Sequence, residues 1–112
     1  MINVVDKRSV RFAFRNHGQE LLTVYIYRIG DSIFSNKRET VTIAGGQSVT
    51  FMRDVGCIVG LPSWGNDLIL SAQKNGSSMS GVFLDRSQQN YYSGFNSGDL
   101  VTFVWKIRSS ST

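Results

Sequence analysis

The sequence Ser9-Val10-Arg11-Phe12-Ala13-Phe14-Arg15 places large apolar side chains at every second position and two arginines between them. Successive side chains of an extended chain point to opposite faces, so this period of two predicts a strand with one buried face. We expect Val10, Phe12 and Phe14 to face the core and Arg11 and Arg15 to face solvent. No segment of the chain shows a sustained helical period.

Working outward from this strand, further β-rich segments recur at short intervals. The segment 21–29 is long, β-branched and aromatic, which predicts a central strand. Ala44-Gly45-Gly46-Gln47 and Asn75-Gly76 are turn sequences, and each predicts a hairpin between its flanking strands. The other predicted strands are 40–43, 48–51, 55–61, 67–72, 79–84 and 100–107. In the last strand, the period of two predicts one shared face for Val101, Phe103, Trp105 and Ile107.

This spacing of strands and turns predicts an all-β fold, an antiparallel sandwich or barrel of 7–9 short strands, as small all-β domains commonly have. We favour a single-domain antiparallel β-sandwich that spans residues 1–112, with 109–112 as a frayed tail. The chain of 112 residues is long enough for one core.

The formal net charge is +4, but the basic residues are scattered in small groups. This charge favours anionic membranes, nucleic acid or acidic partners, although a solubility surplus explains it more simply. The N-terminal residues do not resemble a signal peptide, and no apolar run is long enough for a membrane-spanning helix. We expect the chain to act where it is made or to leave without a leader, unless a leader has been removed.

Residues that could carry catalysis are few and separate. The single cysteine, Cys57, lies in an apolar strand-like run and is expected to be a buried core residue. The single histidine, His17, lies in a turn, and we expect it to be solvated. The eight carboxylates are spread singly, without a calcium loop or a paired arrangement. We therefore predict no enzyme activity, no cofactor and no metal.

The segment 88–99 places Tyr91, Tyr92 and Phe95 among glycines and turn-forming polar residues. Aromatic rings on a polar loop are suited to ligand contact, because they offer large area with few rotatable bonds. The alternative is that these rings fold back onto the core. Trp64 lies in another turn, and all four rings would form one aromatic platform if both turns emerge at the same end of the sandwich.

Two stretches resemble families of small membrane-binding β-sandwich proteins. The run from Val41 to Phe51, soon followed by Cys57, resembles the central hairpin of aegerolysins. The order of 67–70, Asn75-Gly76, 82–83 and 89–96 is similar to the actinoporin region in which paired strands lead into an aromatic loop that holds a phospholipid head group. The resemblance implies that Tyr91, Tyr92 and Phe95 contact a head group.

The chain lacks the tryptophan-rich motif of aegerolysins and the N-terminal amphipathic helix with which actinoporins make a pore. The resemblance therefore implies lipid recognition without autonomous pore formation. It is a likeness of fold, and fold does not fix function.

We predict a non-enzymatic recognition module that binds a membrane lipid head group or a glycan through Tyr91, Tyr92, Phe95 and Trp64. One alternative is a protein–protein interaction or assembly domain, including a homo-oligomer, that associates through exposed strand edges. A more distant alternative is single-stranded nucleic-acid binding, which is disfavoured because the aromatic and basic residues do not interleave on one strand.

Overall fold

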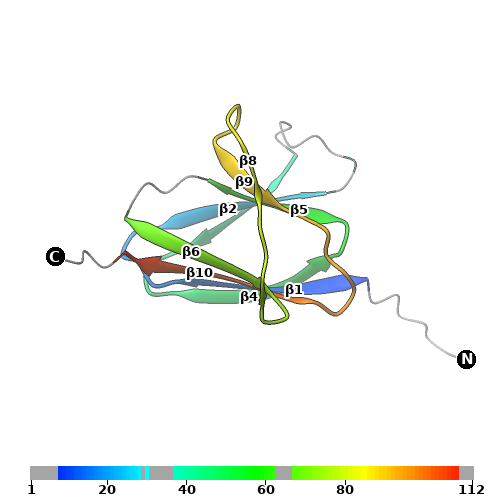
Figure 1. Cartoon of the computed structure of the whole chain (residues 1–112), viewed down its shortest axis with the longest axis horizontal. Coiled ribbons are helices and arrows are strands. Elements are labelled where there is room, and N and C mark those ends of the chain that lie inside the picture. The colour runs from blue at the N-terminus through cyan, green and yellow to red at the C-terminus, as the bar shows by residue number, and fades with distance from the viewer. Residues whose placement is uncertain (1–7, 29, 31–36, 63–66, 109–112) are drawn as a thin grey trace, which may run out of the picture.

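The computed structural model describes residues 8–28, 30, 37–62 and 67–108, which form two stacked β-sheets without a helix (Figure 1). The strands in chain order are β1 (Ser9–Asn16), β2 (Leu22–Arg28), β3 (Glu39–Ile43), β4 (Ser48–Asp54), β5 (Cys57–Pro62), β6 (Leu68–Lys74), β7 (Ser77–Ser78), β8 (Val82–Leu84), β9 (Gln89–Tyr92) and β10 (Leu100–Ile107). The predicted single-domain β-sandwich is confirmed.

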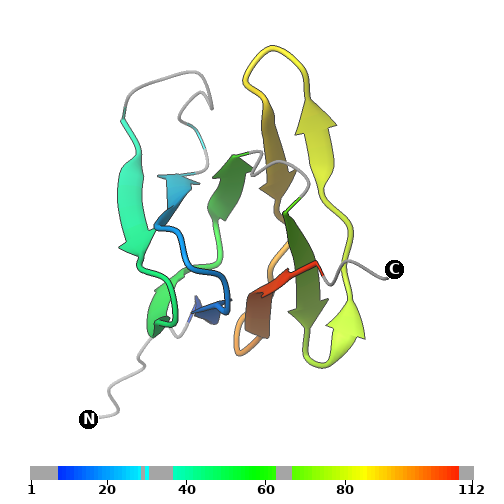
Figure 2. The same ribbon diagram turned by 90° about the vertical axis from the view of Figure 1, so that its left-hand side faces the viewer.

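The two layers differ in strand order. One layer, the β1 sheet, has the order β4-β1-β10-β6-β7, and the other, the β2 sheet, has the order β3-β2-β5-β9-β8. Strand pairs are antiparallel except β1 and β10, which run parallel in the middle of the β1 sheet. Figure 2 shows the β8–β9 hairpin at one edge of the molecule.

The core follows from the alternation in β1 and β10. Val10, Phe12 and Phe14 are fully buried, as expected, while Arg11 and Arg15 are exposed on the outer face. On β10 the side chains of Val101, Phe103 and Trp105 are buried in the same cluster. The rings of Phe14 and Phe103 stack with centroids 5.1 Å apart, which ties the central parallel pair together. Ile107, predicted for the same face, is exposed near the end of β10.

The predicted hairpin between β3 and β4 is wrong. The two strands belong to different sheets: β3 pairs with β2, and β4 pairs with β1. The turn 44–47 is therefore a corner between the layers. It is held by backbone hydrogen bonds from Gly46 N to Asn16 O and from Asn16 N to Gln47 O. A Cβ on Gly45 would lie 2.5 Å from the Gln19 backbone, so this close crossing needs glycine.

The predicted Asn75-Gly76 hairpin is confirmed over a short length. Both residues have positive φ, as a type I′ turn requires, and β7 pairs with the end of β6. The chain then leaves the β1 sheet, and β8 pairs with β9 in the β2 sheet. One predicted strand, 79–84, is thus replaced by two short strands on different layers. With β9, which lies in the segment predicted as a loop, the described residues form ten strands.

Among the described residues, none belongs to a helix that is long and apolar enough to span a bilayer.

Candidate functional site

The aromatic segment predicted as a ligand-binding loop is part of the folded body. Its residues Gln89–Tyr92 form β9, which lies between β5 and β8 in the β2 sheet. Tyr91, Tyr92 and Phe95 are only 8%, 7% and 6% exposed. The expectation that the three rings face solvent is therefore wrong, and the alternative that they fold back onto the core holds for Tyr92 and Phe95.

Two of these rings fill the space between the sheets. Phe95 meets the edge of Phe12 with centroids 5.1 Å apart and ring planes at 87°. Tyr92 meets Phe103 at 5.1 Å and 69°. Burial raises the pKa of the Tyr92 hydroxyl because the charged phenolate is poorly solvated there. The turn after β9 thus carries Phe95 back into the core, which explains an aromatic ring among glycines and polar residues.

Tyr91 points the other way, onto the outer face of the β2 sheet. Its ring packs against Tyr27 with centroids 6.0 Å apart, and its hydroxyl donates to Ser87 Oγ at 2.8 Å. Nearby, Gly60 lies in register with Tyr91 and leaves room for these side chains. Trp64, the fourth predicted contact, lies outside the described residues. The other three rings are explained by packing.

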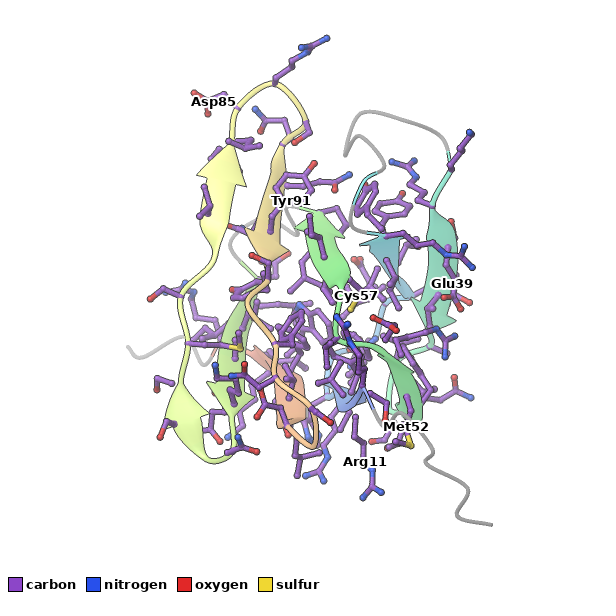
Figure 3. All side chains as sticks on the ribbon, turned by 90° about the vertical axis from the view of Figure 1, so that its right-hand side faces the viewer. Arg11, Glu39, Met52, Cys57, Asp85 and Tyr91 are labelled. Atoms are coloured by element: carbon purple, nitrogen blue, oxygen red, sulfur yellow. The ribbon has the colours of Figure 1, made fainter. Side chains whose placement is uncertain are left out.

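A different surface feature has the composition of a binding site. It is a groove of about 950 Å³ at the open end of the sandwich, where β2 and β4 end and β3 and β5 begin. We call it the basic groove. Its residues are Arg8, Ile26, Arg28, Lys37, Arg38, Glu39, Arg53, Asp54, Gly56 and Cys57. In Figure 3, Glu39 and Cys57 mark its position.

The register brings these residues together from distant parts of the chain. Arg28 pairs with Cys57 across β2 and β5, and Ile26 pairs with Glu39 across β2 and β3. Arg53 enters from β4 in the other sheet. Five cationic side chains meet two carboxylates, so the groove has a formal surplus of three positive charges. Such a concentration of one sign attracts anions and raises their local concentration.

One acidic residue is already paired inside the groove. Arg53 Nε donates to Glu39 Oε1 at 2.8 Å, and its Nη2 atom donates to Glu39 Oε2. The Arg53 hydrogen bonds lower the pKa of the Glu39 carboxyl, and the same bonds raise the pKa of Arg53. Both side chains are more than one third exposed, so the pair adds little stability. Its effect is to hold Arg53 at the groove wall.

A second arginine is positioned by aromatic residues. The Arg38 guanidinium lies 3.9 Å from the centroid of the Tyr25 ring, and Nη1 donates to the Tyr27 hydroxyl at 3.3 Å. A cation over a ring face is stabilised by the ring quadrupole. These contacts keep Arg38 in place without neutralising its charge.

The two remaining arginines are unengaged. Within 8–28, 30, 37–62 and 67–108, the side chains of Arg8 and Arg28 make no hydrogen bond or ion pair. They are exposed at the groove, so their donors are available to an incoming anion.

The floor of the groove is apolar and carries no reactive thiolate at neutral pH. Ile26 and Cys57 are each 5% exposed, and the prediction of a buried Cys57 is confirmed. Burial raises the pKa of the Cys57 thiol to about 11, so the thiol stays protonated at neutral pH and is a weak nucleophile. The groove is thus equipped to bind by charge and hydrogen bonding.

Other predicted features lie elsewhere. His17 is exposed after β1, as expected for a solvated turn histidine. In the described part of the chain, no three His, Cys, Asp or Glu residues come together as metal ligands would. The groove residues were missed in the sequence because Lys37-Arg38 and Arg53-Asp54 are short charge groups. Their position at opposite ends of two successive strands was the available signal.

Comparison with known proteins gives no match to a family model, a curated protein or a solved structure. The resemblance to aegerolysins and actinoporins therefore stays a prediction.

Proposed function

We propose that this protein is a non-enzymatic recognition module whose basic groove binds a compact ligand bearing several phosphate groups. The observation that carries the proposal is that five cationic residues line one groove with an apolar floor. The ligand chemistry is that of a phosphorylated polyol, either free in solution or as the head group of a membrane lipid.

Size and geometry support a compact ligand over a polymer. Small-molecule sites occupy roughly 300–1,000 Å³, and the groove is at the upper end of that range. Arginine suits phosphate because its planar donors bind two oxygens at once. Arg8 lies just before β1 and Arg28 ends β2, so the two arginines approach the groove from different sheets. Arg38 lines the rim, where Tyr25 holds its guanidinium on the outer face of the β2 sheet.

The test is calorimetric titration with inositol hexakisphosphate, with unphosphorylated inositol as the neutral control. We define the groove variant as Arg8→Gln/Arg28→Gln. The matched control is Arg11→Gln/Arg15→Gln, which removes the same charge from the outer face of the β1 sheet, away from the groove. Loss of binding in the groove variant alone supports the proposal. Equal loss in both variants contradicts it, because long-range attraction would then explain binding.

Glu39→Gln gives an independent check with the opposite sign. The substitution removes a negative charge from the groove and abolishes the ion pair between Glu39 and Arg53. We expect about threefold to tenfold tighter binding of the phosphate ligand, since one nearby charge is worth roughly 1 kcal/mol at a surface site. Weaker binding would show that Arg53 must stay paired to form the site.

A second experiment distinguishes a free phosphorylated ligand from a lipid head group as the natural source of the phosphates. Vesicles that contain a phosphorylated inositol lipid are compared with the soluble ligand at the same phosphate concentration. Competition between them at the groove indicates a shared site for both sources. Binding of the soluble ligand without vesicle binding limits the function to a free metabolite.

A second candidate, assembly through strand edges, has an observation of its own. β8 ends the β2 sheet, and its Val82 and Phe83 side chains are 63% and 46% exposed. An exposed apolar edge is a template for another strand. Light scattering of the wild type and of Val82→Lys tests this role. A defined oligomer that the substitution dissociates supports assembly, and a monomer in both contradicts it.

A further inference from the structure

The outer face of the β1 sheet carries a second group of cations, separate from the basic groove. Arg11 and Arg15 project from β1, and Lys106 projects from the neighbouring strand β10. The only carboxylate at an outward position of the four long strands of this sheet is Asp54, at the end of β4, which also lines the basic groove. The outward positions of these strands therefore carry a formal surplus of two positive charges, and Asp99, just before β10, lies near Arg11 at one end of the face.

Large apolar side chains flank two of these three cations. Arg11 lies in register between Met52 on β4 and Leu100 on β10, and Lys106 lies in register with Ile69 on β6. Met52, Leu100 and Ile69 are 51%, 44% and 47% exposed. Figure 3 shows Arg11 and Met52 side by side on the lower face, turned away from the interior.

The centre of the face carries short side chains. The row Thr50, Ala13 and Thr102 crosses three strands between the two flanked cations. The arginines, Lys106 and the aliphatic side chains therefore project further than their neighbours. Arg11 and Arg15 lie four residues apart on one strand, a separation of about 13 Å, so the face meets a partner over an area and not at a point.

We propose that this face docks on the surface of an anionic lipid bilayer. Cations that face an anionic membrane are attracted to its head groups, and aliphatic side chains beside them can enter the boundary between head groups and acyl chains. The outward positions of the face carry no aromatic ring, whereas surfaces for single-stranded nucleic acid stack bases on aromatic side chains. The proposal is independent of the groove and of its ligand.

The experiment is co-sedimentation with vesicles of phosphatidylcholine alone or mixed with phosphatidylserine, at low and high salt. The face variant is Arg11→Gln/Arg15→Gln, and the groove variant Arg8→Gln/Arg28→Gln is its control with the same net charge. Each cation near an anionic surface is worth about a fivefold change in partitioning. We expect the face variant to partition about 25-fold less onto phosphatidylserine vesicles, with the groove variant close to wild type.

A second variant tests the aliphatic side chains. Met52→Ser/Leu100→Ser should remove the part of the binding that survives high salt, because salt screens only the charges. Lys106→Gln should weaken binding by about fivefold on its own, which checks the far end of the face. Thermal unfolding of each variant shows whether it folds as the wild type does.

Three outcomes would overturn the proposal. They are equal loss in the face and groove variants, no preference of the wild type for phosphatidylserine vesicles, and binding of a labelled single-stranded oligonucleotide that the face variant loses while vesicle binding is kept. The proposal for the basic groove is tested separately. Binding of inositol hexakisphosphate should depend on Arg8 and Arg28 and should be the same in the face variant as in the wild type.

Discussion

The Tyr27 hydroxyl donates a hydrogen bond to Gln89 Oε1, 3.1 Å away, and so joins β2 to β9 across the outer face of the β2 sheet. The bond crosses Gly60 on the intervening strand, where a Cβ would lie 2.6 Å from that same Oε1 atom and 2.9 Å from the Tyr27 ring. Tyr27 is fully buried, and Gln89 is 8% exposed. The absence of a side chain at position 60 thus allows a buried polar link over the strand.

Removing the Tyr27 hydroxyl should leave the buried Gln89 Oε1 atom without its hydrogen-bond donor. Tyr27→Phe takes away the donor to a buried carbonyl oxygen and one partner of Arg38. We expect it to lower the free energy of unfolding by about 1–3 kcal/mol, measured by urea denaturation. In a double-mutant cycle with Gln89→Leu, the two losses should be less than additive. Strict additivity would show that the two side chains do not depend on each other.

The core role of the aromatic segment gives a second prediction. Tyr92→Ala and Phe95→Ala each remove a ring from between the sheets, and we expect each to lower the free energy of unfolding by about 3–5 kcal/mol. The control is Phe83→Ala on the exposed edge strand β8, which should cost less than about 1 kcal/mol. If the Tyr92 and Phe95 variants are as stable as this control, the rings are not part of the core.

Asp99 makes stability depend on pH. Hydrogen bonds from Asn96 N and from Asn75 Nδ2, together with the nearby Lys74, hold the pKa of its carboxyl below the ordinary value of 3.8. A depressed pKa in the folded state means that the stabilisation is complete above 3.8 and is lost as the pH falls through the lower folded value.

The measurement is the free energy of unfolding between about pH 6 and about pH 2 for the wild type and for Asp99→Asn. The wild type should lose more stability on acidification than the variant does. Parallel pH curves would assign the acid sensitivity to other carboxylates.

Cys57 should react slowly in the folded protein. With its pKa raised from 9.0 to about 11, the thiolate fraction near neutral pH falls about 100-fold. Alkylation by iodoacetamide should therefore be at least that much slower in the native protein than in denaturant. Similar rates in both states would mean that the floor of the groove opens readily to solvent.

Much of the architecture was readable in the chain because backbone alternation is a local property. Val10, Phe12 and Phe14 against Arg11 and Arg15 predicted both faces of β1, and the same period predicted the buried face of β10. The Asn75-Gly76 turn was also predictable, since its positive φ angles suit those two residues. Cys57 was placed correctly by its apolar neighbours.

Strand partners and sites depended on contacts between distant residues. Ala44-Gly45-Gly46-Gln47 looks like a hairpin turn, but Gly45 fits against the Gln19 backbone and the chain changes sheets there. Tyr92 and Phe95 lie among polar residues in the sequence, yet Phe103 and Phe12 bury them.

The basic groove shows the same division. Its arginines were visible in the chain as separate small groups, and their number and charge were determined by the sequence alone. Pairing of β2 with β5 and the corner between β3 and β4 brought them to one end of the sandwich. The alternation of buried and exposed side chains along a strand is set by residues that are neighbours in the sequence. The charge density of a site depends instead on the tertiary packing, which decides which strand ends come together.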